Sequence, residues 1–99
     1  MIMEKEKKYI VEKVVHNGRK DELGKPVTQE KYHGLIGYEV KCNDLNDIVL
    51  FEPLYMKVIN SPRYVWWYTS DVMNSVHIKK DNKYVVETLN SIYYFRKVK

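Results

Sequence analysis

RYVWWYTS, residues 63–70, is the stretch that decides the fold of this 99-residue chain. It consists almost wholly of aromatic and β-branched residues, which favour β-strands. Because neighbouring side chains on a strand point to opposite faces, Trp66 and Trp67 cannot both face one core. We expect two rows: Val65, Trp67 and Thr69 in the core, and Tyr64, Trp66 and Tyr68 on an amphipathic outer face.

Six further segments are expected to be strands, namely residues 8–16, 35–42, 48–53, 75–80, 83–89 and 91–98. In the second, Ile36, Tyr38, Val40 and Cys42 should share one face. Asp81 and Asn82 fit a tight two-residue hairpin turn. An Asn-Ser pair occurs directly before an expected strand twice, in MNSVHI (73–78) and in LNSIYY (89–94). Asn and Ser side chains close local turns, so each pair is expected to mark the entry to a strand.

About seven short strands with no room for a long helix predict an all-β fold. The expected architecture is a small SH3-like or partly open barrel of about six to seven strands. The polar segment 19–34 is expected to be a long loop, and the alternative is an α+β fold with one short helix in 21–32. The chain should form a single domain, 1–99, with 1–7 a disordered N-terminal tail.

The charge is distributed unevenly along the chain, which has a net charge of +4. Residues 1–52 carry nine Lys/Arg and ten Asp/Glu, whereas residues 53–99 carry eight and three. An acidic middle contains Glu39, Asp44, Asp47 and Glu52 with one base, Lys41. The basic C-terminal half is either an ordinary solvated surface or an attractor of phosphate or of an acidic partner.

Cys42 is the only cysteine, so the chain can form neither an intramolecular disulfide nor a cysteine-based zinc site. The N-terminus has no apolar signal segment, and no window approaches the ~18 apolar residues of a membrane span. These features predict a cytoplasmic protein without membrane association.

No catalytic motif is present. His16, His33 and His77 are far apart in the sequence, and His77 alternates with Val76 and Ile78, so it should face outward. Cys42 ends an apolar face and should behave as a small hydrophobe. There is no glycine-rich phosphate loop, and Asp44 with Asp47 falls short of a calcium loop. We therefore expect no enzyme activity, no metal and no cofactor.

The C-terminal third resembles a pattern in small β-rich proteins of low-GC Gram-positive bacteria and their phages, most of them uncharacterised. The matching positions are Trp67, Thr69, Ser70 and Val72, followed by Thr88, Asn90, Ser91 and Tyr93. This resemblance implies a β-rich fold and a phage or mobile-element setting, with no activity attached.

The expected function is therefore binding, in an accessory or regulatory protein. Tryptophan, tyrosine and arginine dominate protein–protein hot spots, so a protein partner or self-association is favoured. The alternative is a small barrel that binds single-stranded nucleic acid or a nucleotide, because tyrosines that include Tyr84 and Tyr93 alternate with cations in the C-terminal half. The candidate binding residues are Arg63, Tyr64, Trp66, Tyr68, Lys79, Lys80, Tyr94 and Arg96. Trp66 is the expected centre of this site, unless the 17–34 loop covers it.

Overall fold

A computed structural model describes residues 6–16, 35–59, 61–62 and 65–98. The described chain contains six strands: β1 (Glu6–His16), β2 (Glu39–Asn43), β3 (Pro53–Ile59), β4 (Trp66–Ile78), β5 (Lys83–Thr88) and β6 (Ser91–Lys97). Two 3-10 turns, η1 (Leu45–Asp47) and η2 (Lys79–Asp81), follow β2 and β4. The helix considered for 21–32 lies outside the described residues. Glu6 and Lys7, expected in the tail, belong to β1.

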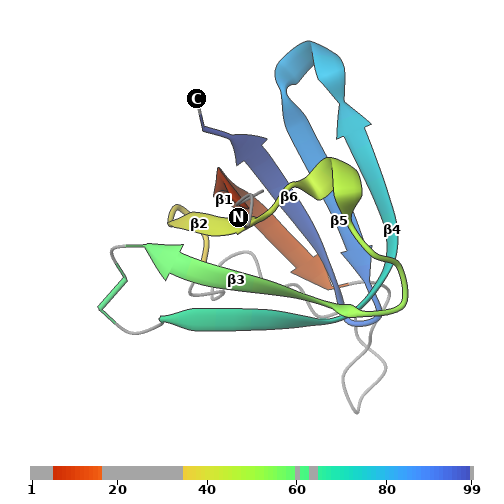
Figure 1. Ribbon diagram of the computed structural model, residues 1–99, viewed down its shortest axis with the longest axis horizontal. Coiled ribbons are helices and arrows are strands. Elements are labelled where there is room, and N and C mark those ends of the chain that lie inside the picture. Colours follow the sequence, from red (N-terminus) through yellow and green to blue (C-terminus); the bar gives the residue numbers. More distant parts are fainter. Residues whose placement is uncertain (1–5, 17–34, 60, 63–64, 99) are drawn as a thin grey trace, which may run out of the picture.

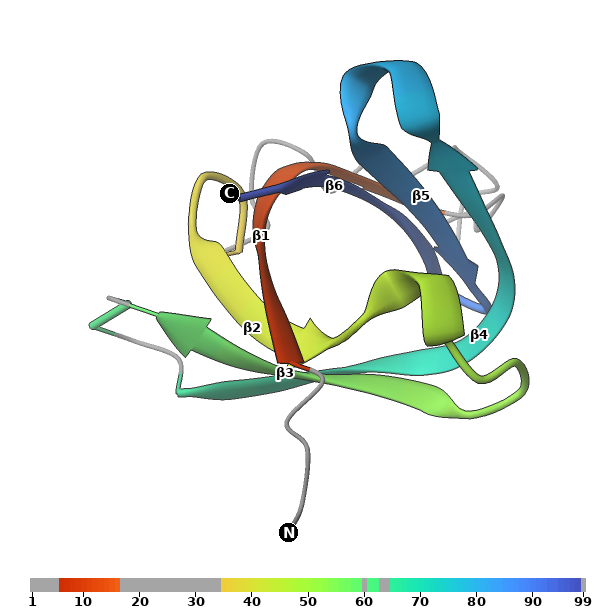
Figure 2. The same ribbon diagram turned by 45° about the horizontal axis from the view of Figure 1, so that its top comes forward.

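The six strands form one antiparallel sheet in sequence order, and β1 pairs with β6 to close it into a ring. The prediction of an all-β fold is confirmed. The ring is not a regular barrel, because β3 and the first half of β4 run side by side away from it as a two-stranded ribbon (Figure 1). Figure 2 looks into the ring and shows η1 at its open end.

β4 is a single bent strand of thirteen residues, where the sequence predicts two. Its pairing with β5 shifts register between Val72 and Asn74. Asn74 and Ser75 pair with β5 directly after this shift, so they lie within the strand rather than in a turn before it. This irregularity moves the side-chain alternation by one residue. His77 therefore turns inward and stacks on Tyr84, with ring centroids 4.1 Å apart. The prediction that His77 faces outward is wrong, because its apolar neighbours Val76 and Ile78 are the exposed residues and His77 lies opposite the buried Tyr84.

The region 44–59 also differs from the prediction of a strand over 48–53. Residues 45–47 form η1, and the strand begins at Pro53 and continues to Ile59. Proline suits the first position of a strand because it has no amide to donate to the ladder. Leu54, Met56 and Val58 are buried and alternate with exposed residues, which is the two-residue period of a half-buried strand.

β2 is shorter than predicted because residues 35–37 form a turn in which Gly37 has a φ of 89°. Val40 and Cys42 are buried as expected, whereas Ile36 and Tyr38 pack only partly against the core. The hairpin between β4 and β5 is present, but its turn comprises η2 and Asn82 rather than two residues alone.

The core combines aliphatic side chains with tyrosines whose hydroxyls bond at the end of the ring. Tyr9 is fully buried and contacts Tyr84 and Phe95 edge-on. Its hydroxyl accepts a hydrogen bond from the Leu45 amide at 3.0 Å. The Tyr84 hydroxyl accepts one from Asn46 Nδ2 at 2.8 Å. Two core tyrosines thereby fix η1, and with it the acidic segment, to the end of the sheet.

Candidate binding site

Three exposed aromatic side chains lie together on the outer face of the β3–β4 ribbon. Tyr55, Trp66 and Tyr68 are 64%, 64% and 68% exposed. Tyr55 is directly opposite Tyr68, with ring centroids 5.7 Å apart, and Trp66 is opposite Lys57. We call these three residues the aromatic face. The expected exposure of Trp66 and Tyr68 is confirmed, and Tyr55 is an addition from the neighbouring strand.

Trp67 faces the opposite way from Trp66. It packs against the core while remaining partly exposed, and its indole N–H donates to the Tyr93 hydroxyl at 3.2 Å. Thr69 is buried as expected, but Val65 is 62% exposed, so its assignment to the core is wrong. Val65 precedes β4, where the alternation that places Trp67 and Thr69 inside does not yet apply.

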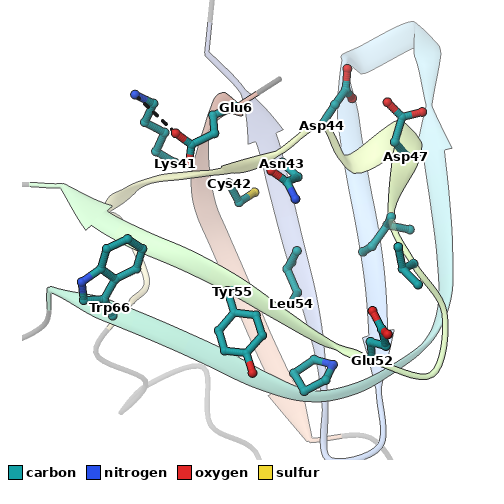
Figure 3. Close-up of a pocket in the computed structure, with 13 residues that line it drawn as sticks. Glu6, Lys41, Cys42, Asn43, Asp44, Asp47, Glu52, Leu54, Tyr55 and Trp66 are labelled. Carbon is teal, nitrogen blue, oxygen red and sulfur yellow. Dashed lines mark ion pairs between the residues drawn. The ribbon is translucent and has the colours of Figure 1, made fainter. Parts of the chain in front are cut away.

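A pocket of about 510 Å³ lies beside the aromatic face, between the end of β2 and the start of β3 (Figure 3). Its most buried lining residues are Cys42 and Leu54, and Tyr55 and Trp66 contribute its aromatic side. The remaining lining residues are Glu6, Lys41, Asn43, Asp44, Asp47, Ile48, Val49, Glu52 and Pro53. We call it the β2–β3 pocket.

The pocket exists because the β2–β3 ladder ends early. The strands pair from Glu39↔Ile59 to Lys41↔Lys57 and no further, although β2 continues to Asn43 and β3 begins at Pro53. The chain between them makes a wide excursion through η1 instead of a tight hairpin. Asn43 and Tyr55, which would form the next outward-facing pair, both line the resulting gap.

The wall of the pocket is acidic. Four carboxylates line it against the single ammonium of Lys41, which leaves a formal charge of −3. Glu6 Oε1 lies 3.7 Å from Lys41 Nζ. Asp44 Oδ1 accepts hydrogen bonds from the Asn46 backbone and side chain, and the backbone bond does most to lower the pKa of Asp44. The carboxylates of Asp47 and Glu52 form no hydrogen bond or ion pair with the described residues, and these two residues bond only through their backbones, to Asp44 and Val72.

Cys42, at the floor, is not arranged as a nucleophile. Only 2% of the residue is exposed, and burial, followed by the charges of Glu6 and Asp44, raises its pKa to about 12. A thiol with such a pKa is almost wholly protonated near neutral pH. The expectation that Cys42 is a small buried hydrophobe is consistent with this position.

Three consecutive apolar side chains are exposed at the rim, in the turn that leads to β3. Val49, Leu50 and Phe51 are all exposed, and Val49 lines the pocket. Phe51 has a φ of 67°, in the left-handed region that bulky residues rarely adopt. The turn is held in place because the Phe51 amide donates to the Val72 carbonyl at 2.7 Å. A run of exposed apolar residues is a liability unless it has a function.

The other predicted site residues lie elsewhere. Lys79 and Lys80 are exposed in η2, at the tip of the β4–β5 hairpin. Tyr94 and Arg96 point outward from β6, where Lys13 Nζ lies 5.5 Å from the Tyr94 ring centroid and Arg96 Nε lies 3.1 Å from Glu12 Oε2. Arg63 and Tyr64 are outside the described residues. The structure thus brings Trp66 and Tyr68 together and separates them from Lys79, Lys80 and Arg96.

The acidic wall and Tyr55 are the parts of the site that sequence reasoning missed. The acidic middle is visible in the sequence, but nothing there indicates that it meets Trp66. For Tyr55 the signal was present, since the alternation LYMKVI over 54–59 is typical of a strand.

Comparison of the chain with protein-family models, curated proteins and solved structures finds no match. In the part of the chain that the structure describes, no three His, Cys, Asp or Glu side chains are placed to hold a metal ion. The same residues contain no helix long and apolar enough to cross a membrane.

Proposed function

We propose that this protein is a binding domain without catalytic chemistry that engages a protein partner through the aromatic face. The observation that carries the proposal is the exposure of Tyr55, Trp66 and Tyr68 side by side on neighbouring strands. Tryptophan and tyrosine are the residues most enriched in interface hot spots. They offer large apolar area at a small loss of conformational entropy.

Two further features support a protein partner. The exposed tip of Val49, Leu50 and Phe51 adds aliphatic and aromatic area at the rim of the β2–β3 pocket, which Tyr55 and Trp66 also line. The fixed turn that carries the tip reduces the entropy lost on binding. The aromatic face and the tip are apolar, whereas the β2–β3 pocket is acidic; protein interfaces likewise combine apolar area with polar groups.

Single-stranded nucleic acid is a poorer fit to this geometry. Base stacking needs exposed aromatic rings beside cations. Tyr84 and Tyr93 are buried, and Glu12 forms ion pairs with both Lys83 and Arg96. The exposed aromatic rings adjoin an acidic pocket, which repels phosphate, although one cation, Lys57, lies opposite Trp66.

The biological setting proposed with this function is that of an accessory or regulatory protein in the cytoplasm, encoded by a phage or mobile element. The free buried thiol of Cys42 supports a reducing compartment. The resemblance of the C-terminal third supports the phage or mobile-element setting.

Affinity capture with matched baits tests the proposal. Full-length wild type, Trp66→Ala, Tyr68→Ala and Leu89→Ala would be compared, because Leu89 is an exposed apolar residue outside the aromatic face. Light scattering at two concentrations would show whether a second copy is the partner. We expect one protein to be retained by wild type and Leu89→Ala and lost from the two aromatic variants. Equal retention by all four baits would overturn the proposal.

A further inference from the structure

We propose that the β2–β3 pocket binds an extended basic segment of the partner protein, with one lysine or arginine side chain between the aromatic face and the acidic wall. This inference rests on the proposed function and names the chemistry of the partner. Its elements are a charged cavity, an aromatic side and an unpaired strand edge, all at one place on the molecule.

The charge of the pocket favours a cation. The wall has a formal charge of −3, whereas the whole chain has a net charge of +4, so the negative potential is local to this site. The carboxylates of Asp47 and Glu52 form no ion pair or hydrogen bond within the described part of the chain, so an incoming cation can pair with them there. Lys41 pairs with Glu6. In Figure 3 these two residues lie at one end of the lining, and Asp47 and Glu52 lie at the other end.

The aromatic side of the pocket favours a cation on an apolar stem. Trp66 and Tyr55 line the cavity while remaining largely exposed. A lysine or arginine side chain can lay its methylene stem on these rings and its charge against the ring faces or the carboxylates. A small inorganic cation would use only the carboxylates. The volume of about 510 Å³ lies within the range of ~300–1,000 Å³ that ligand pockets have.

The edge of β3 favours an extended peptide. Backbone groups alternate in direction along a strand. The Val58 amide donates to Val65 on the β4 side, so Tyr55, three residues earlier, directs its backbone N–H and C=O toward β2. The described β2–β3 pairing has already ended there. An extended segment can therefore add backbone hydrogen bonds at Tyr55 while its side chain fills the pocket.

Two short blocked peptides serve as probes, acetyl-TVRVT-amide and its neutral counterpart acetyl-TVQVT-amide. Each is titrated into the ¹⁵N-labelled full chain, in which the two tryptophans give two indole N–H signals. We expect the arginine peptide at millimolar concentration to shift the Trp66 indole signal in a saturable way, with the Trp67 signal unmoved. The glutamine peptide should bind at least fivefold more weakly, and added salt should reduce the difference.

Matched variants identify which carboxylates pair with the arginine of the peptide. Asp47→Asn removes the acid at the last position of η1, and Asp81→Asn removes the acid at the same position of η2. Asp47→Asn and Glu52→Gln should each weaken the arginine peptide severalfold, whereas Asp81→Asn should leave its affinity unchanged. Equal affinity for both peptides, no shift of the Trp66 signal, or no effect of Asp47→Asn and Glu52→Gln would overturn the inference.

The result separates this inference from the proposed function. If the captured partner is lost from Trp66→Ala but retained by Asp47→Asn/Glu52→Gln, the aromatic face binds a protein and the basic segment is refuted. If Trp66→Ala retains the partner, the proposed function itself fails. Self-association abolished by Lys79→Glu/Lys80→Glu would refute a separate partner and assign the pocket to the hairpin tip of a second copy.

Discussion

Adjacent tryptophans have opposite roles in this protein. Trp67 packs against the core and donates a hydrogen bond to Tyr93, whereas Trp66 is 64% exposed. Trp67→Ala should therefore cost about 3 kcal/mol of unfolding free energy, through the loss of the indole packing and of its hydrogen bond to the Tyr93 hydroxyl. Trp66→Ala should change it by no more than about 0.5 kcal/mol. Urea denaturation checks both, and equal losses for the two variants would contradict the assignment.

The Tyr9 ring packs in the core, whereas the Tyr9 hydroxyl holds η1 in place. It is the acceptor for the buried Leu45 amide at the start of η1. Tyr9→Phe keeps the ring packing and leaves that amide unsatisfied, so it should cost about 1–3 kcal/mol. Tyr68→Phe, at an exposed position, is the matched control and should be neutral. Urea denaturation of both variants is the measurement, and a neutral Tyr9→Phe would show that η1 is not held by this bond.

The Cys42 thiol makes the fold sensitive to alkaline pH. Its pKa is raised by burial from 9.0 to about 12, so the unfolded chain loses this proton before the folded chain does. Its contribution to stability is complete below pH 9 and is lost as the pH rises toward 12. Cys42→Ala should therefore show a smaller loss of stability over this interval in urea titrations. A steeper loss in that variant would contradict the burial of the thiol.

At the scale of elements, the sequence predicts a strand where the two-residue alternation is uninterrupted. β1, β5 and β6 lie close to their predicted bounds because alternating residues such as Tyr93 and Phe95 fill the core. The predicted strand over 48–53 has the wrong bounds, because Pro53 begins β3 and does not end a strand. The break predicted in β4 is wrong because Asn-Ser occurs at a register shift inside the strand. Local composition does not distinguish a turn from a bulge.

The turn before β3 holds an aromatic residue in a backbone conformation that suits glycine. Phe51 has a φ of 67°, and its side chain is exposed. Phe51→Gly relieves a strain of about 1 kcal/mol and increases the entropy of the unfolded chain by a similar amount, so stability should change little. Partner retention should fall, because the tip loses its largest apolar group. Thermal denaturation and affinity capture measure the two effects, and a large destabilisation with unchanged retention would assign Phe51 to the fold.

At the scale of the whole molecule, the separation of β2 from β3 creates the candidate site. The acidic segment and Trp66 are about twenty residues apart in the sequence, and they meet only because β2 and β3 separate beyond Lys41↔Lys57. The sequence shows the exposed tryptophan and the excess of acid, but where a ladder ends depends on the packing of η1 against Tyr9 and Tyr84. The basic residues Lys79, Lys80 and Arg96 lie on the β4–β5 tip and on β6, apart from this site.

The central claim is that this protein binds a partner through the aromatic face and the β2–β3 pocket. The most direct test is to map which residues change their environment when the captured partner binds. The measurement is the pair of ¹H–¹⁵N spectra of the full chain with and without the partner. We predict shifts at the Trp66 indole, Tyr55 and Glu52, with the Trp67 indole unmoved. Shifts confined to Lys79, Lys80 and Arg96 would contradict the account.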